Sequence, residues 1–195
     1  MIAPVTAPVS PDALVAALPP FEAFPSIPRL FRECIVTEKV DGSNASVTVL
    51  DDGRVIAGSR NRYITPDADN FGFAAWVAAH AIELRDGLGV GRHYGEWYGA
   101  GIQRGYGLTD KRFALFNVSR WGDDATRPAC CGVVPVLYRG EMDTARIRGA
   151  LTMLAAGGSV IVPGFTKPEG VVVFHVASGH QYKSTLDKHD GHKGA

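Results

Sequence analysis

Two apolar strand patterns on either side of a Lys-Val-Asp-Gly turn constrain the fold of this chain more than any other feature. Residues 34–36 form one apolar run, and small or β-branched residues alternate with polar ones from Ala45 to Val49. Such runs favour strands, whereas the Asp-Gly pair favours a turn. The pattern predicts that Lys39 lies where a strand gives way to a turn. An ordinary hairpin is the simplest structure of this kind.

Lys39 is a candidate nucleophile at this turn. A lysine amine attacks only when it is neutral, so it must be activated by desolvation or by nearby cations such as a metal ion. Gly42 has no Cβ, which lets a bound phosphate or sugar approach the backbone. The motif by itself is weak evidence and indicates function in roughly one case in ten.

Composition places the chain among globular proteins. It has 195 residues, of which 46% are hydrophobic and 21% charged, which suits one domain with a sizeable core. The formal net charge is zero, so any nucleic-acid contact must be a local patch. The three cysteines form no disulfide framework, and no targeting or membrane-spanning segment is recognisable. We therefore expect a cytoplasmic protein without membrane contact.

The order of patterns predicts the domain organisation. Residues 1–28 are rich in proline and form an N-terminal arm, residues 29–186 form the domain, and residues 187–195 form a polar tail. We expect helices over residues 71–84, capped by Asp69 or Asn70, and over residues 144–156. The expected strands cover residues 34–36, 45–49, 55–58, 93–98, 111–118, 160–162 and 169–176. Without βαβ alternation, this indicates an α+β fold with antiparallel sheets flanked by helices.

Further polar and aromatic residues follow the Lys39 turn in a recognisable order. They are Arg60, Glu96 in Tyr-Gly-Glu-Trp, Phe116, Glu169 before a valine run, and Lys183. This order resembles the motifs of the covalent nucleotidyltransferases, which comprise ATP-dependent DNA ligases, RNA ligases and mRNA capping enzymes. The resemblance spans residues 34–184 and implies their ATP-grasp-like nucleotidyltransferase domain.

Within that superfamily the chain is most similar to the RNA ligases. DNA ligases and capping enzymes generally carry an arginine directly after K-x-D-G-x, whereas this chain has Asn44 there, as nick-sealing phage-type RNA ligases do. The segments 58–61 and 101–107 also resemble that group. The glycines of the second segment match no phosphate-binding motif, and we expect a flexible substrate loop there.

The resemblance implies a reaction in which Lys39 attacks the α-phosphate of ATP and becomes a lysyl-adenylate. The AMP then passes to a nucleic-acid 5′-phosphate, and a 3′-hydroxyl displaces it to join RNA ends or a nicked duplex. Charge develops on phosphoryl oxygens in each step, so cations must face them. Lys183 would serve as such a cation, and Glu169 would bind Mg²⁺ or Mn²⁺.

The same resemblance assigns the nucleotide pocket. Glu38 and Asn44 would shape the adenosine site, and Arg60 would reach the nucleotide and the reacting end. Glu96 would bind the ribose hydroxyl, and Phe116 would stack on adenine. Taken singly, each residue has a simpler role, such as core packing for Phe116 or a surface ion pair for Arg60. Their joint order favours the site.

Two departures weaken the later steps of the reaction. The motif around Lys183 usually reads K-x-K, but Gln181 replaces its first lysine. We also expect no OB domain and no helical carboxy-terminal domain after it. Strand joining would therefore be weak or need an accessory protein or domain in trans. Two alternatives stay open: a capping-type guanylyltransferase that uses GTP, and a degenerate module that binds nucleotide or RNA ends without chemistry.

Overall fold

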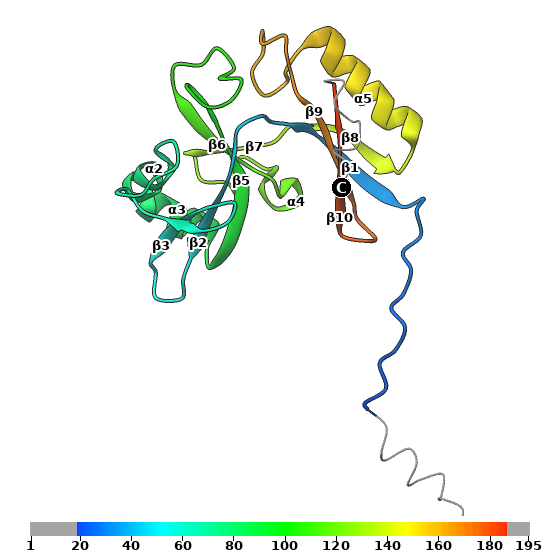
Figure 1. The fold of residues 1–195 in the computed structure, drawn as a ribbon, viewed down its shortest axis with the longest axis horizontal. Helices are drawn as coiled ribbons and strands as arrows, with labels where there is room; N and C mark the ends of the chain where they lie inside the picture. Colours follow the sequence, from blue (N-terminus) through cyan, green and yellow to red (C-terminus); the bar gives the residue numbers. More distant parts are fainter. Residues whose placement is uncertain (1–18, 187–195) are drawn as a thin grey trace, which may run out of the picture.

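The computed structural model describes residues 19–186, which form a four-stranded and a six-stranded sheet side by side (Figure 1). The four-stranded sheet has the order β10-β9-β1-β8, and all its neighbours are antiparallel. Its strands are β1 (Glu33–Lys39), β8 (Val136–Glu141), β9 (Gly170–His175) and β10 (His180–Thr185).

The six-stranded sheet has the order β4-β3-β2-β5-β6-β7, and only its last pair, β6 and β7, is parallel. Its strands are β2 (Ser43–Val49), β3 (Val55–Ser59), β4 (Tyr63–Ile64), β5 (Gly91–Gly99), β6 (Lys111–Leu115) and β7 (Cys131–Val133). The antiparallel-dominated α+β class expected from the sequence is confirmed.

Each sheet buries one face under helices. Helices α2 (Phe73–Ala79) and α3 (Ala81–Leu88) place Phe73, Val77 and Leu84 in the core of the six-stranded sheet. Helix α5 (Thr144–Gly157) covers the four-stranded sheet, and the short α4 (Val118–Trp121) follows β6. No helix within residues 19–186 is long and apolar enough to cross a membrane.

The single helix predicted over residues 71–84 is wrong, because the structure breaks it at His80. His80 takes a φ of −107°, outside the helical range, and its ring Nδ1 lies 2.8 Å from the Trp76 carbonyl oxygen. The N-cap residue is Gly72 and not the predicted Asp69 or Asn70, but the Asp69 carboxylate still accepts the backbone N–H groups of Ala74 and Ala75 in the first turn. The helix predicted over residues 144–156 is confirmed as α5.

Most predicted strands are confirmed, but the one over residues 160–162 is wrong. Val160 and Ile161 donate their N–H groups to the Glu38 carboxylate instead of to a neighbouring strand. The strand predicted over residues 111–118 ends early at Leu115, and Asn117 then caps α4. Strands β4, β7, β8 and β10 were not predicted.

The hairpin interpretation of the Lys39 turn is wrong. Strand β1 pairs with β8 and β9, whereas β2 pairs with β3 and β5, so the two strands that flank the turn belong to different sheets. Residues 40–42 carry the chain from one sheet to the other (Figure 1). Lys39 therefore lies where the sheets meet.

The predicted arm and tail are only partly visible. Residues 19–29 form neither helix nor strand, are exposed, and extend away from the sheets (Figure 1). The rest of the arm and the predicted tail over residues 187–195 lie outside the described residues.

Candidate active site

Lys39 and Glu169 form an ion pair at the shared end of β1 and β9. Lys39 is the last residue of β1 and lies opposite Gly170, the first residue of β9, so Glu169 directly precedes the paired region. The Lys39 Nζ and a Glu169 carboxylate oxygen are 2.5 Å apart, and the two side chains are 25% and 18% exposed. The amine is thus held by a carboxylate but stays reachable from solvent.

The register of the four-stranded sheet places Lys183 and Gln181 on the same face as Lys39. Lys183 lies opposite Val172, which lies opposite Thr37, two residues before Lys39. Paired residues share a face, and so do residues two apart on one strand. The other face of this sheet packs against α5. Lys183, the predicted phosphate-directed cation, and Gln181, which replaces the first lysine of the motif, therefore lie on the face that α5 does not cover.

The six-stranded sheet contributes Asn44, Glu96 and Phe116. Asn44 on β2 lies opposite Glu96 on β5, and its Nδ2 donates to the Glu96 carboxylate at 3.1 Å. Phe116 donates its N–H to the Tyr94 carbonyl, two residues before Glu96, which places it on the same side of the sheet. Opposite pleat positions on β2 and β5, such as Ala45, Val47 and Trp97, pack in the core with α2 and α3.

Arg60, which follows β3, joins this group through Asn44. Its Nε and Nη2 donate to the Asn44 side-chain oxygen at 2.9 and 2.6 Å. Asn44 therefore connects an exposed guanidinium to the buried Glu96 carboxylate. The structure brings these three predicted residues into one hydrogen-bonded chain.

The Glu96 carboxyl is the strongly perturbed acid of this region. Burial raises the pKa of Glu96 to about 7, although the Lys39 charge, the Gly42 N–H and the Asn44 amide favour its ionised form. A Cβ on Gly42 would lie 2.4 Å from the Trp97 carbonyl oxygen, so the glycine allows the turn to approach β5. We expected the missing Cβ of Gly42 to let a phosphate or sugar approach, but in the structure strand β5 occupies the space beside this glycine.

Glu38 is a structural anchor in this arrangement. Its side chain is 1% exposed, and its carboxylate accepts the Ser159 hydroxyl at 2.6 Å and the N–H groups of Val160 and Ile161 at 2.8 and 3.0 Å. These bonds attach the segment after α5 to β1 next to Lys39. A direct contact between Glu38 and a nucleotide stays a prediction.

Two residues that the sequence analysis did not single out, Arg104 and Tyr106, also hold the turn. Arg104 Nε donates to the Asp41 carboxylate at 2.8 Å, and the Tyr106 hydroxyl accepts the Asp41 N–H at 2.7 Å. Arg104 and Tyr106 belong to the glycine-rich segment that we expected to be a flexible substrate loop. That expectation is wrong in the structure, because both side chains bond to the turn. The sequence signal that could have indicated this role is a basic and an aromatic residue, Arg104 and Tyr106, interleaved with glycines.

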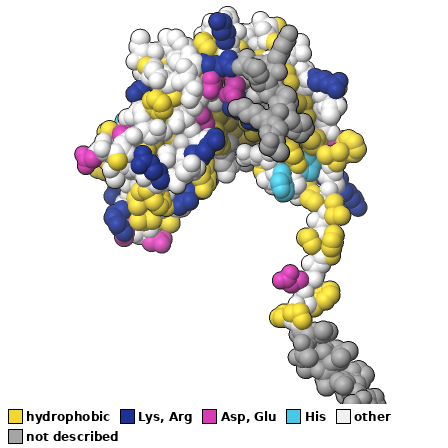
Figure 2. Space-filling model, viewed as in Figure 1, with side chains coloured by type: hydrophobic (Ala, Val, Ile, Leu, Met, Phe, Trp, Pro, Cys, Tyr) yellow, Lys and Arg dark blue, Asp and Glu magenta, His cyan; other side chains and the backbone are white. Residues whose placement is uncertain are grey.

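An apolar cluster beside the site packs β5 and β6 against the 40–42 turn and the segment after α5. Charged side chains of both signs gather where the sheets approach each other (Figure 2). The buried members of the cluster are Val40, Tyr98, Tyr106, Ala114, Val134 and Val162, with Phe116 partly buried against them. Phe116 thus lies at the edge of a core cluster, which leaves both packing and stacking roles open to it.

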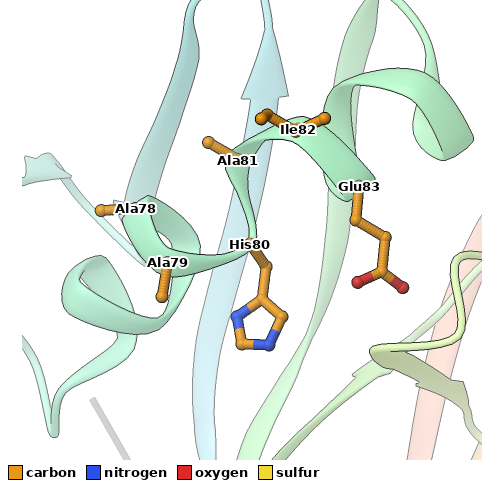
Figure 3. Close-up of a pocket in the computed structure, with 6 residues that line it drawn as sticks. All are labelled: Ala78, Ala79, His80, Ala81, Ile82 and Glu83. Atoms are coloured by element: carbon orange, nitrogen blue, oxygen red, sulfur yellow. The ribbon is translucent and has the colours of Figure 1, made fainter.

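Two cavities lie elsewhere. One of about 350 Å³ is lined by residues 78–83 at the junction of α2 and α3, and one of about 530 Å³ lies at the C-terminal end of α5. In the first, the His80 ring and the Glu83 carboxylate extend from the same side of the junction (Figure 3). Both are engaged internally, since Glu83 accepts the Cys130 N–H at 2.8 Å. Neither cavity is lined by the residues around Lys39.

The donor groups present fit a metal ion that arrives with phosphate rather than a resident one. Within residues 19–186, no group of three or more His, Cys, Asp or Glu side chains is arranged to hold a metal. Glu169 offers one carboxylate beside the Lys39 amine. Mg²⁺ commonly binds through one or two carboxylates together with substrate phosphates and waters, which is compatible with this site.

Comparison with known proteins gives a family match over most of the chain. The model of the family described as RNA ligase matches residues 32–184, which includes every site residue named above. A comparison with curated proteins finds no match.

Solved structures with a similar fold include several of Naegleria gruberi RNA ligase. Its structure with PPi has 22% sequence identity and a TM-score of 0.58, covering 86% of this chain and 57% of that one. A mutant with AMP and Mn has 20% identity and a TM-score of 0.60, covering 80% and 50%. A mutant with ATP and Mn has 23% identity and a TM-score of 0.57, covering 78% and 48%. The chain spans about half the length of these proteins.

Proposed function

Because this chain belongs to the RNA ligase family, we propose that it is an ATP-dependent ligase that forms a covalent lysyl-AMP at Lys39. The observation that carries the proposal is the Lys39–Glu169 ion pair, which is partly exposed where the two sheets meet. The Arg60–Asn44–Glu96 chain belongs to the neighbouring sheet. Residues 29–186 would then constitute a nucleotidyltransferase domain of the ATP-grasp-like type.

The first step is attack of the Lys39 amine on the α-phosphorus of ATP. A nitrogen–phosphorus bond forms, the bond to the pyrophosphate oxygen breaks, and the amine loses its proton. An ammonium group has no lone pair, so the Lys39–Glu169 pair must give up its proton before attack. Glu169 would hold the amine in place until the triphosphate is bound.

Glu169 would also bind a divalent metal ion that enters with the triphosphate. Such an ion neutralises charge on the phosphoryl oxygens and stabilises the departing pyrophosphate. Naegleria gruberi RNA ligase has been solved with ATP and Mn, which supports a nucleotide and a divalent cation in this fold. Mg²⁺ and Mn²⁺ are both candidates for this chain.

The six-stranded sheet would bind the nucleoside. A carboxyl at the position of Glu96 suits a ribose hydroxyl, and Asn44 would orient it by their hydrogen bond. Phe116 is partly exposed and aromatic, which suits stacking on adenine. Arg60 would reach the phosphates or the reacting end, and Glu38 would support the pocket through the residues 159–161 that it anchors.

The later steps would pass AMP to the 5′-phosphate of an RNA or nicked-duplex end and release it when a 3′-hydroxyl attacks. Lys183, exposed on the face that contains Lys39, would face the developing phosphoryl charge. Gln181 lacks the charge of the first lysine in the K-x-K motif that this region resembles. We propose that sealing is weaker than adenylation, or that it uses an accessory protein or domain in trans.

Incubation with α-labelled ATP or GTP and Mn²⁺, followed by a denaturing gel, tests this proposal. We expect a labelled protein band with ATP and little or none with GTP. A band with GTP alone would identify a capping-type guanylyltransferase. Nucleotide binding without any covalent band would identify a degenerate binding module.

A further inference from the structure

Arg104 connects the two segments that present Lys39 and Glu169. It lies between β5 and β6, its Nε donates to the Asp41 carboxylate at 2.8 Å, and its Nη1 donates to the Lys167 carbonyl at 3.1 Å. Asp41 is two residues after Lys39, and Lys167 is two residues before Glu169. One guanidinium therefore bridges both sides of the Lys39–Glu169 pair from the neighbouring sheet.

The segment that presents Arg104 is firmly built. Tyr106 is 3% exposed, packs against the rings of Tyr98 and Phe165, and accepts the Asp41 N–H. Gln103 and Tyr106 have φ angles of 44° and 54°, a region that residues other than glycine occupy only where surrounding contacts hold them. The contacts of Tyr106 hold the backbone after Arg104, and the bonds to Asp41 and Lys167 orient the guanidinium.

We propose that Arg104 is a positioning residue that holds the Lys39 amine against Glu169 by tying the 39–42 turn to the strand end that carries Glu169. Its catalytic consequence depends on the function proposed above. An arginine suits this place because its planar fork donates in two directions at once, whereas a lysine ammonium is a single point charge. Both Arg104 and Asp41 are largely buried, with side chains 23% and 22% exposed, so their ion pair is less screened than a surface pair.

The reactivity of the Lys39 amine toward acetic anhydride tests this without any nucleotide. The extent of acetylation of the Lys39 peptide is measured by mass spectrometry for native protein, Arg104→Met and Arg104→Lys. Arg112→Met is the matched control, because it breaks an arginine–aspartate pair of the same length, with Asp110, that is exposed. All variants are first shown to unfold cooperatively near the native melting temperature.

We expect Arg104→Met to raise the acetylation rate of Lys39 several-fold, because a loosened turn frees the amine from Glu169. Arg104→Lys should fall between Arg104→Met and native protein, and Arg112→Met should match native protein. A native acetylation rate in Arg104→Met overturns the proposal. If Arg104→Met does not fold, the same comparison of Arg104→Lys with native protein decides.

Single-turnover adenylation and equilibrium ATP binding separate positioning from substrate contact. Loss of positioning should slow adenylation by roughly 10-fold or more while ATP affinity changes by less than about 3-fold. Equal losses of rate and affinity would show that Arg104 contacts ATP directly, which overturns the proposal. If native protein is never adenylated, the proposed function fails, and the acetylation result still decides whether Arg104 positions Lys39.

Discussion

Asn44 and Glu96 lie opposite each other on β2 and β5, and the Asn44 amide donates to the Glu96 carboxylate at 3.1 Å. Asn44 uses its oxygen to accept two bonds from Arg60. The Glu96 carboxyl is buried, and the nearby Lys39 charge favours its ionised form. Asn44 therefore links this carboxyl to the exposed guanidinium of Arg60. Arg60, Asn44 and Glu96 thus form one hydrogen-bonded chain within the candidate site.

The raised pKa of Glu96 predicts a pH-dependent stability. Burial raises this pKa from 4.5 to about 7, so between these values the folded state keeps a proton that the unfolded state has lost. The free energy of unfolding should therefore fall as pH rises from 4.5 to 7, by up to about 3 kcal/mol for this group.

Glu96→Gln keeps an acceptor for Asn44 but cannot ionise, so the difference in stability between variant and native protein should grow across this window. Urea denaturation of both proteins from pH 5 to 8 measures it. Parallel stability profiles would show that Glu96 ionises without penalty.

Glu38 should contribute strongly to stability. Glu38→Ala leaves the Ser159 hydroxyl and two backbone N–H groups without their acceptor, and we expect a loss of about 2–4 kcal/mol in the free energy of unfolding. The control is Glu33→Ala on the same strand, whose exposed ion pair with Arg139 is worth less than about 1 kcal/mol. Chemical denaturation compares them. Equal losses in both variants would refute the anchoring role.

The local parts of the fold could be predicted from sequence. Alternation identified β2, a short apolar run identified β3, a valine run identified β9, and the helical pattern ended at the glycines that close α5. Strand β10 was missed because it is a polar edge strand without an apolar face, and its pairing with β9 supplies the structure. Strand β8 was missed because an interior Gly140 and mixed burial obscure its alternation.

The sequence predicted which residues belong to the candidate site and their order along the chain. It did not predict how they contact one another. Nothing local to residues 38–43 indicates that β1 and β2 enter different sheets, because both partners of β1, β8 and β9, lie about 100 residues or more further along the chain. The Asp41–Arg104 contact joins residues 63 positions apart. The anchoring of Glu38 likewise depends on a segment more than 120 residues away. Such contacts arise from packing and leave no local pattern.

Glu169→Gln should separate nucleotide binding from metal-dependent chemistry. The amide can still accept from Lys39 but is a weaker metal ligand, so ATP affinity should change little while adenylation slows by roughly 10-fold or more. The metal concentration for half-maximal adenylation should rise. Titrations with Mg²⁺ and Mn²⁺ in native and variant protein measure both effects. Unchanged activity with an unchanged metal response would remove Glu169 from metal binding.

Gln181→Lys should improve sealing more than adenylation. The substitution adds a cation on the sheet face that holds Lys39 and Lys183, where nucleic-acid phosphates would approach. Single-turnover adenylation and sealing of a nicked duplex with a 3′-OH RNA end are compared for both proteins. Native sealing should also fall steeply with salt, since end binding is electrostatic. Efficient native sealing without a gain in the variant would show that glutamine is accommodated at this position.

The most direct test of the account is to locate the covalent nucleotide. Native protein is incubated with ATP and Mn²⁺ across neutral to mildly alkaline pH, digested, and analysed by mass spectrometry. The account predicts AMP on the Lys39 peptide, more of it as pH rises because the amine must be neutral. Lys39→Ala should carry no AMP. The control is Lys111→Ala, which removes a lysine whose amine donates to the Phe71 carbonyl, and this variant should be adenylated like native protein. AMP on another residue, or persistent adenylation of folded Lys39→Ala, would contradict the assignment of Lys39 as the nucleophile.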